Sequence, residues 1–389
     1  MISNQLLQQE FLRRLLQCGT LTRSEFTAAG NYRAATVLKA VDELKALGLL
    51  LEPDRNGSRT GRRSPRLRIN PDAGRFIGLE VTSDHLYGVV CDATGQPTAT
   101  ASLEPGWRFH ASDLPQLLNA LLRKLCREPA ECYSGIALAD PGLVDTRRQV
   151  SLRSVAIAGW NGLETGKLLR QLSHLEQTLV IPECGARSYL EYSERCRHFD
   201  GSLFHLRLDD GIGAGFIQNG TLFSGDSCCA MELGHLVLIP DGPLCQCGNR
   251  GCLEAIAGLA GIRRRIAELE ANSVRTILRT DGFQLKDLPA AVRSGDRPAQ
   301  LLASDICEQI APVFAIIATL LNPGCIVISG ALKELGELLL DTIRRSLRER
   351  CLQATLAGLR LELSSLDEFA GALGAARLLR DRLLLQKIR

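Results

Sequence analysis

Residues 232–254 read ELGHLVLIPDGPLCQCGNRGCLE, and this stretch contains four side chains that are good zinc ligands: His235, Cys245, Cys247 and Cys252. The three cysteines lie within eight residues of one another, on a glycine-rich loop that can wrap around an ion. With the histidine they make a tetrahedral set of the Cys3His type. Because protein fills all four positions, we predict a structural zinc ion. The alternative is a group of free thiols or a disulfide, and a disulfide would leave one of the three cysteines unpaired.

On both sides of this stretch, strand patterns alternate with helix patterns, which is typical of an α/β protein. Paired strands are expected at 76–81 and 86–92, and a buried strand follows at 134–139. A second block of strands begins at 203–208. Since each block starts with a strand hairpin, we predict a duplicated architecture with a cleft between the two halves.

The composition limits the class of protein. The chain has 389 residues, which suits two or three domains, and 45% of them are hydrophobic, as in a globular protein with a sizeable core. We find no uninterrupted apolar run long enough to span a membrane, and no basic and then apolar signal segment at the N-terminus. We therefore expect a cytoplasmic protein without a membrane partner. In that reducing compartment, most of the 14 cysteines are expected to be free thiols.

The first 70 residues differ from the rest of the chain in charge. They contain twelve Lys or Arg and six Asp or Glu, a net charge of +6 in a chain whose total is +3. The remaining residues are therefore mildly acidic. This asymmetry predicts a polyanion as the partner of the N-terminal segment alone.

The N-terminal segment has the pattern of a winged helix-turn-helix domain over residues 1–70. Apolar residues at helical spacing predict a first helix, and Thr22 and Glu25 have capping-box spacing for a second one. A third helix is predicted from about Arg33 to Leu47. Two short strands then flank a hairpin tip rich in Gly and Arg. The alternative is a small helical protein-interaction domain with a solvated charge run, but the basic wing argues against it.

In a winged helix-turn-helix, the third helix enters the major groove of DNA by its N-terminal residues. We expect its first turn to face base edges and Lys39 to contact phosphate, while the arginines of the wing follow the backbone or reach the minor groove. The residues predicted to contact double-stranded DNA are Thr22, Arg23, Arg33, Ala34, Ala35, Thr36, Lys39, Arg59, Arg62 and Arg63.

Two motifs carry a resemblance to a known family: Glu232-Leu233-Gly234-His235 and the Cys-x-Cys-Gly-x-x-Gly-Cys-Leu-Glu run that ends at Glu254. Supporting stretches are 140–145, 159–160, 211–215, 321–323, 326–330 and 371–376. With these residues, nearly the whole chain resembles the ROK family (repressors, open reading frames and sugar kinases), on its repressor branch. The resemblance implies an actin-like, sugar-kinase-like fold over 71–389, with lobes at roughly 71–185 and 186–389 and sugar in the cleft.

The resemblance also implies roles for three side chains. Glu232, His235 and Glu254 correspond to residues that hydrogen-bond sugar hydroxyls in the family. His235 would then use one ring nitrogen for zinc and the other for sugar, so that the metal orients the ligand-binding edge.

The sequence departs from the kinases of the family at three places. A first phosphate loop with two glycines is replaced by 80–85, which reads EVTSDH, and the second phosphate loop has Asp209-Asp210. Negative charge at these places repels polyphosphate. The Asn-Asp pair that supplies the catalytic base is replaced by Glu183-Cys184, and a thiol is a poor base at neutral pH. We therefore predict no catalytic residues and no enzymatic activity.

The function predicted is that of a DNA-binding transcriptional regulator, a repressor of carbohydrate metabolism genes that responds to a sugar or sugar phosphate. One alternative is an ATP-dependent sugar kinase with an appended DNA-binding domain. Another is a DNA-binding scaffold that no ligand regulates, because Glu183-Cys184 removes two ordinary sugar contacts. A homodimer or homotetramer is expected, since one winged helix gives little specificity and operators mirror protein symmetry.

Overall fold

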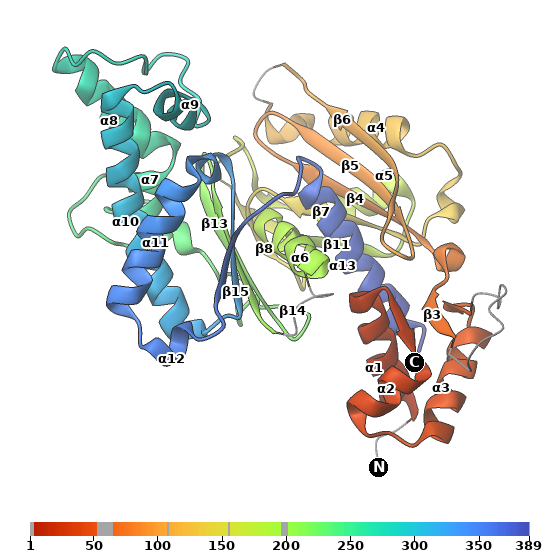
Figure 1. Ribbon diagram of the computed structural model, residues 1–389. Coiled ribbons are helices and arrows are strands. Elements are labelled where there is room, and N and C mark those ends of the chain that lie inside the picture. Colours follow the sequence, from red (N-terminus) through yellow and green to blue (C-terminus); the bar gives the residue numbers. More distant parts are fainter. Residues whose placement is uncertain (1–3, 53–64, 107–108, 155, 196–200, 389) are drawn as a thin grey trace. The chain divides into compact units, whose positions relative to one another are not determined.

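The computed structural model describes residues 4–52, 65–106, 109–154, 156–195 and 201–388 (Figure 1). The chain forms two compact units. Unit 1 comprises Met1–Asp200 and Asp367–Arg389, and unit 2 comprises Gly201–Leu366. The chain therefore leaves unit 1 once, builds unit 2, and returns to unit 1 with its C-terminal helix.

The N-terminal elements of unit 1 are α1 (Asn4–Cys18), β1 (Thr20–Thr22), α2 (Arg23–Gly30), α3 (Ala34–Ala46), β2 (Leu50–Leu51) and β3 (Arg66–Ile69). The three strands pair antiparallel in the order β1-β3-β2. The predicted capping box is present, because Thr22 Oγ1 accepts a hydrogen bond from Glu25 N (3.1 Å) and Glu25 Oε2 accepts one from Thr22 N (2.8 Å). Three helices and this small sheet make the predicted winged helix-turn-helix.

The rest of unit 1 is built on a five-stranded sheet. Its strand order is β11-β7-β4-β5-β6, in which β4 is antiparallel to β5 and parallel to β7. A smaller sheet of order β10-β9-β8 follows β7 in the chain. The elements are η1 (Pro71–Ala73), β4 (Arg75–Val81), β5 (Leu86–Asp92), β6 (Pro97–Leu103), η2 (Ala111–Asp113), α4 (Leu114–Leu125), η3 (Ala130–Cys132), β7 (Gly135–Asp140), β8 (Leu143–Asp145), β9 (Val150–Arg153), β10 (Asn161–Leu163), α5 (Thr165–Ser173), β11 (Thr178–Pro182), α6 (Glu183–Arg195) and α13 (Ala370–Gln386).

The C-terminal helix α13 packs on this sheet and on α6. Gly78 of β4 permits the close approach, since a Cβ at that position would lie 1.9 Å from the carbonyl oxygen of Ala372. The helix contains two buried arginines, and Arg377 Nε donates to the carbonyl oxygen of Gly95 (2.9 Å). We expected a second lobe over 186–389, but α6 and α13 both belong to unit 1, because they pack against the same sheet.

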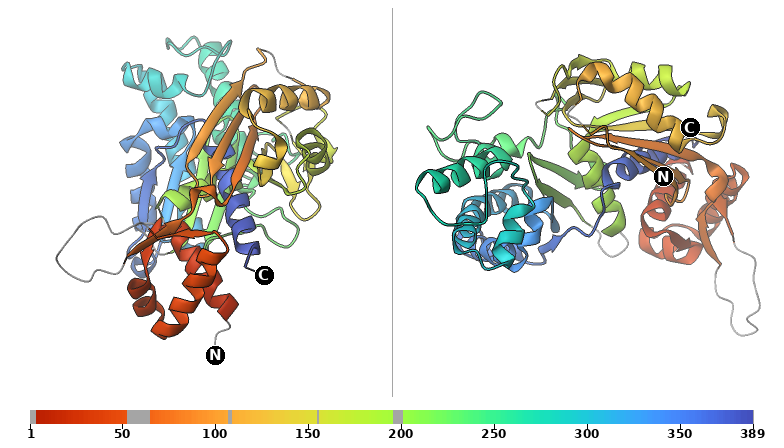
Figure 2. Two further views of the ribbon diagram at one scale, coloured as in Figure 1. Left: turned by 90° about the vertical axis from the view of Figure 1, so that its right-hand side faces the viewer. Right: turned by 90° about the horizontal axis from the view of Figure 1, so that it is seen from above.

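The winged-helix elements share a hydrophobic core with the rest of unit 1. Leu7 and Phe11 of α1 belong to the same buried cluster as Leu384 of α13. At the end of α1, Gln17 Nε2 donates to the hydroxyl of Tyr192 on α6 (3.4 Å). Figure 1 shows α1 beside α13, and Figure 2 shows the same neighbourhood from two further sides. The DNA-binding segment predicted over 1–70 is therefore packed onto the domain that follows it.

Unit 2 is built on a second five-stranded sheet of order β14-β13-β12-β15-β16. Here β12 is antiparallel to β13 and parallel to β15, as β4 is to β5 and β7 in unit 1. This repetition confirms the predicted duplication. The elements are β12 (Leu203–Leu208), β13 (Ile212–Gln218), β14 (Thr221–Leu222), η4 (Leu233–His235), α7 (Leu253–Ala257), α8 (Leu259–Ala271), α9 (Asp287–Arg293), α10 (Arg297–Leu321), β15 (Cys325–Ser329), η5 (Ala331–Leu335), α11 (Glu337–Arg350), α12 (Gln353–Leu356) and β16 (Arg360–Leu363).

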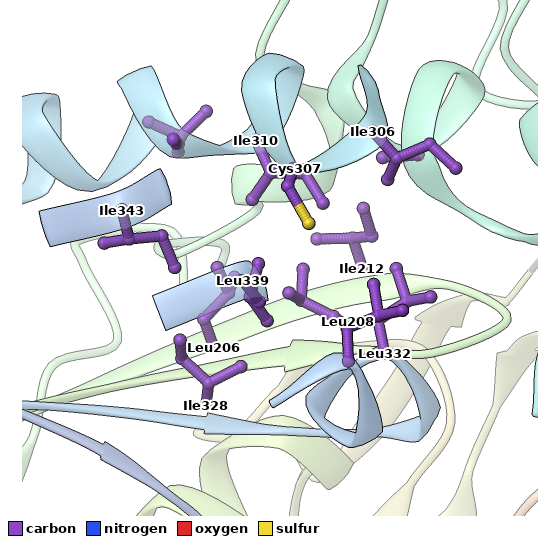
Figure 3. Close-up of a cluster of buried hydrophobic side chains, with 14 of the residues drawn as sticks. Leu206, Leu208, Ile212, Ile306, Cys307, Ile310, Ile328, Leu332, Leu339 and Ile343 are labelled. Atoms are coloured by element: carbon purple, nitrogen blue, oxygen red, sulfur yellow. The ribbon is translucent and has the colours of Figure 1, made fainter. Parts of the chain in front are cut away.

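The core of unit 2 lies between its sheet and the helices α10 and α11. Figure 3 shows Ile306 and Ile310 of α10 facing Leu206 of β12 and Ile328 of β15. Among the described residues, α10 is the one helix long and apolar enough to cross a membrane, although Asp305 and Glu308 interrupt its apolar sequence. However, 61% of its most apolar window is buried inside the protein. Burial in this core accounts for the apolar composition of the helix.

Candidate functional site

The four predicted metal ligands come together in unit 2. Their ligand atoms all lie within 4.8 Å of one another, and Cys245 and Cys252 are buried. His235 Nδ1 lies 3.7 Å from Cys245 Sγ, and Cys247 Sγ lies 3.7 Å from Cys252 Sγ. Ligands bound to a tetrahedral zinc ion at about 2.0–2.3 Å lie roughly 3.5–3.8 Å apart. These two separations match such an ion, and all four ligand atoms are close enough together to share one.

The loop that presents these ligands is a compact hairpin. Two isolated bridges, Val237 with Cys252 and Leu244 with Arg250, close it. Gly251 has φ +70°, and a Cβ there would lie 1.7 Å from the carbonyl oxygen of Ile239, so this position requires glycine. The glycine-rich composition thus allows the loop to turn tightly enough to bring distant ligands together.

The thiols of the cluster are reduced. A sulfur–sulfur distance of 3.7 Å between Cys247 and Cys252 is far from the roughly 2.05 Å of a disulfide. Burial and the neighbouring thiols raise the pKa of Cys252 to about 12. A divalent cation favours the thiolate form, so the cluster suits a metal whose charge offsets this effect. The residues present fit a zinc ion, which would hold the loop closed.

The three residues implied for sugar also lie near one another in unit 2. Glu254, in the first turn of α7, accepts a hydrogen bond at Oε2 from Ile212 N (2.9 Å) at the start of β13. Burial raises the pKa of Glu232 above its ordinary value; nearby His235 lowers it and the Glu254 carboxylate raises it. Because Nδ1 of His235 faces the thiols, its Nε2 is the nitrogen left for a ligand. The metal ligands and the implied sugar residues are thus one connected group.

Each five-stranded sheet has a short turn between its first two strands, where the sequence predicted the two degenerate phosphate loops. In unit 1, Thr82 N donates to the carbonyl oxygen of His85 (2.9 Å), and His85 N donates to Thr82 Oγ1 (3.0 Å). In unit 2, Asp209 N donates to the carbonyl oxygen of Gly211 (3.2 Å), and Asp210 N donates to Asp209 Oδ1 (3.2 Å). These backbone amides are therefore already engaged within their own turns.

The N-terminus of α6 carries a cluster of charged side chains. Arg187 lies one helical turn after Glu183, and its Nε donates to Oε1 of that residue (2.7 Å). The same guanidinium contacts Oε1 of Glu80 through NH2 (2.6 Å), and Glu80 is fully buried. Cys184 sits beside this cluster and is partly exposed. We did not single out Arg187 from the sequence, although its spacing of four residues from Glu183 is a recognisable ion-pair signal.

A second buried carboxylate lies at the end of β7. Asp140 is completely buried, and its Oδ1 accepts hydrogen bonds from Gly142 N (2.9 Å), Ser151 Oγ (2.9 Å) and Trp160 Nε1 (3.1 Å). Burial raises the pKa of Asp140 to about 6, although these hydrogen bonds oppose the change. The carboxylate of Asp140 therefore has a structural role in the motif 140–145. It links the end of β7 to Ser151 of the small sheet and to Trp160.

The predicted DNA-binding residues fall into three groups. The side chains at the start of α3 are exposed, whereas Thr22 is buried as the cap of α2 and Arg23 forms a paired contact with Glu52 (3.0 Å to each oxygen). Arg59, Arg62 and Arg63 lie outside the described residues. The exposed group comprises Arg33, Ala34, Ala35, Thr36 and Lys39.

The pair between Arg23 and Glu52 is reinforced by Lys45, whose Nζ lies 2.6 Å from Glu52 Oε2. Hydrogen bonds from both cations lower the pKa of Glu52 to about 2. The guanidinium of Arg23 thus links the start of α2 to the residue that follows β2. This contact stabilises the fold of the winged helix.

Known proteins resemble the chain along nearly its whole length. It is 27% identical over 380 residues to the DNA-binding transcriptional dual regulator NagC of Escherichia coli K12, covering 96% of this chain and 91% of the relative. It is 33% identical over 256 residues to a glucokinase of Thermotoga maritima, covering 64% and 80%. The crystal structure of a ROK family transcriptional regulator, a homologue of the E. coli Mlc protein, shares its fold with a TM-score of 0.79 at 23% identity, over 99% of both chains. A profile of the ROK family matches residues 76–382. This chain belongs to the ROK family.

Proposed function

We propose that this protein is a DNA-binding transcriptional repressor of carbohydrate metabolism genes, regulated by a sugar. The observation that carries the proposal is a winged helix-turn-helix packed onto a ROK domain within one unit. A relative named as a DNA-binding transcriptional regulator aligns with 96% of the chain, which includes this N-terminal part. The charge of +6 over the first 70 residues supports a polyanion partner.

The proposed DNA contacts are the exposed residues at the start of α3 together with Lys39 and the arginines of the wing, Arg59, Arg62 and Arg63. Short side chains at Ala34 and Ala35 let the helix approach base edges closely, so that Arg33 and Thr36 also face them, while Lys39 supplies a phosphate contact. A homodimer or homotetramer would present two such helices to a palindromic site.

The proposed effector site uses Glu232, His235 and Glu254. Carboxylates and an imidazole are good partners for sugar hydroxyls, since each can accept hydrogen bonds in a fixed direction. The proposed zinc ion, bound by His235, Cys245, Cys247 and Cys252, holds the histidine ring in place, so its role is structural.

We further propose that the protein has no kinase activity. Phosphoryl transfer depends on backbone amides and cations that surround the phosphates and on a base that activates the attacking hydroxyl. The turn at 82–85 uses the amides of Thr82 and His85 internally, and the turn at 209–211 adds two carboxylates. The resemblance to the family implies that Cys184 stands in the position of the base. The pairing of Arg187 with Glu80 and Glu183 also supports the absence of kinase activity, because the charge of this arginine is already offset by two carboxylates.

A sugar kinase with an appended DNA-binding domain is the second candidate function, and it is favoured by the 33% identity to a glucokinase. A coupled assay for ADP formation with a broad panel of sugars separates the two candidates. We expect no sugar-dependent turnover above background. Turnover of about 1 per second or more, typical of kinases, would support the enzyme instead.

DNA binding is tested by selection from a random duplex library, followed by affinity measurements at fixed salt. We expect a specific site bound at least about a thousandfold more tightly than random DNA, as for other regulators. Ala35→Glu, which places a negative charge on the exposed start of α3, should abolish specific binding. The matched control is Ala46→Glu, the same change at the exposed far end of α3, which should leave specific binding nearly intact. Failure to select any sequence would refute the regulator.

Regulation is tested by adding sugars and sugar phosphates to the selected complex. An effector should release the DNA, and Glu254→Ala should prevent that release without weakening DNA binding. If no sugar changes the affinity for the selected DNA, the protein is a DNA-binding scaffold that no ligand regulates.

A further inference from the structure

Helix α3 has one buried side and one exposed side. Val37, Ala40, Val41 and Leu44 are buried in the winged-helix core. The opposite side, which we call the outer face of α3, is exposed. It comprises Ala34, Ala35, Thr36, Leu38, Lys39, Asp42 and Ala46.

Leu38 is the large apolar side chain of this outer face, and 49% of it is exposed. It lies four residues after Ala34 and three after Ala35, so the three side chains adjoin one another on the helix surface. None of them can donate or accept a hydrogen bond through its side chain. Next to this apolar surface, Lys39 lies 3.9 Å from Glu43, and Asp42 lies 3.9 Å from Arg23. The charged side chains therefore follow this apolar surface along the helix, beginning at Lys39.

This arrangement limits how the helix can read DNA. Guanine is usually recognised by a bidentate Arg or Lys, and adenine by Asn or Gln. On the outer face, Lys39 is the one such side chain, and the exposed Arg33 directly precedes the helix. The surface around Leu38 is apolar, and the apolar group in the major groove is the C5-methyl of thymine.

We propose that Leu38, with Ala34 and Ala35 beside it, reads thymine methyl groups in the major groove. Leu38 is thereby a specificity-determining residue of the DNA interface. The inference rests on the proposed function and goes beyond it by naming the base and the chemical group that are recognised. The basic charge of the segment holds the helix on the duplex, whereas Leu38 distinguishes thymine from cytosine, which lacks the methyl.

The expected change in affinity follows from the free energy of burying one methyl group. Burying one methyl group is worth about a fourfold change in affinity, since a buried CH2 contributes roughly 0.8 kcal/mol and 1.36 kcal/mol is tenfold. A dimer that buries one methyl in each half-site would show about a sixteenfold effect when both are removed.

The test replaces thymines of the selected duplex, one position at a time, by deoxyuridine, which lacks only the methyl group. Affinity is measured by fluorescence anisotropy at fixed salt with the full chain. We expect deoxyuridine at one or two positions in each half-site to weaken binding by about fourfold. In Leu38→Ala, binding should be weaker for the thymine duplex and no longer sensitive to deoxyuridine at those positions.

The matched control is Leu47→Ala, because Leu47 lies at the end of α3 and is 50% exposed. This variant should keep the full sensitivity to deoxyuridine. Both variants change exposed leucines to a strong helix former, and thermal melting confirms that they fold. Equal affinity for thymine and deoxyuridine at every position, or full sensitivity in Leu38→Ala, would overturn the inference while leaving the regulator intact. A chain that selects no sequence would overturn both.

Discussion

The two five-stranded sheets have the same strand order and the same pattern of parallel and antiparallel pairs, but their surroundings differ. In unit 1, the connection from β6 to β7 contains the short helix α4, and the C-terminal helix α13 covers the sheet. In unit 2, the connection from β14 to β15 is much longer and contains the metal-ligand loop and four helices. The same sheet topology therefore carries different helices and loops in the two units.

The chemistry of corresponding positions differs as well. Strand β7 ends in Asp140, a buried carboxylate, whereas its counterpart β15 ends in Ser329, whose hydroxyl pairs with His205 (2.7 Å). In the charged cluster at the N-terminus of α6, Arg187 pairs with Glu80 and Glu183, while in the turn of unit 2 Arg207 pairs with Asp209 (2.8 Å). Topology thus decides where polar groups gather, and individual residues decide whether a ligand or the protein itself satisfies them.

The largest loss of stability is expected when the proposed metal site of unit 2 is removed. Cys252→Ser should lose the proposed zinc and lower the free energy of unfolding by more than about 4 kcal/mol, a size typical of a lost metal site. Metal content measured by mass spectrometry should fall from one ion per chain to a small fraction. Hydrogen exchange should rise in unit 2 around 232–257, with less change in unit 1.

The matched control for that prediction is Cys132→Ser, which changes an exposed cysteine of unit 1. It should keep one zinc ion and alter the stability by no more than about 0.5 kcal/mol. A wild-type protein that contains no metal, or that keeps its stability when a strong chelator is added, would contradict the structural role of zinc.

The next largest difference in stability is expected between variants that remove Arg187 of unit 1 or Arg207 of unit 2. Arg187→Met leaves the fully buried Glu80 without this partner, and removing one member of a buried ion pair costs about 3–5 kcal/mol. Arg207→Met breaks a pair whose side chains are about a quarter exposed, so about 1 kcal/mol or less is expected. Denaturant unfolding measures both. Equal losses in the two variants would mean that the cluster at α6 is not the more deeply buried one.

The smallest difference is expected from Asp140 and depends on pH. Burial raises the pKa of Asp140 to about 6, so between the ordinary value near 3.8 and about 6 the folded protein holds this proton more tightly than the unfolded chain does. Raising the pH through that window therefore removes stability. Relative to Asp140→Asn, the wild type should lose up to about 1.4 kcal/mol per pH unit from pH 4 to 6, and nothing further above that.

Asp341→Asn is the control for this measurement, because it makes the same chemical change in unit 2 at a side chain that is 72% exposed. Its stability should follow that of the wild type across the same window. If Asp140→Asn also follows the wild type, the carboxyl is not perturbed by burial.

Much of the site could be predicted from the sequence because its information is local. The predicted metal ligands lie in and just before one glycine-rich loop, at a spacing typical of zinc sites, and the capping box of Thr22 and Glu25 spans four residues. By contrast, the contact of Arg187 with Glu80 joins residues 107 apart, and the pairing of Arg23 with Glu52 joins residues 29 apart. No periodicity or spacing indicates such contacts, since they depend on which strands become neighbours.

The membership of α13 in unit 1 shows the same limit. Its small residues, among them Gly371 and Gly374, were recognised as a motif, but their purpose is clear only in the fold, where a Cβ at Gly371 would collide with Glu80. The lobe boundary we expected near residue 185 followed chain order, and the chain returns to its first sheet only at the end.

The sequence by itself determined the α/β class, the winged-helix pattern and its basic charge, the ligand set for a metal and the family. These depend on composition, on periodicity and on motifs within a few residues, where backbone geometry leaves few alternatives. Only the tertiary structure decided that Glu254 accepts a hydrogen bond from Ile212, that Arg187 pairs with a buried glutamate, and that α1 packs beside α13. These contacts follow from how two sheets of the same topology bury their helices, because burial brings together side chains that are far apart in the chain.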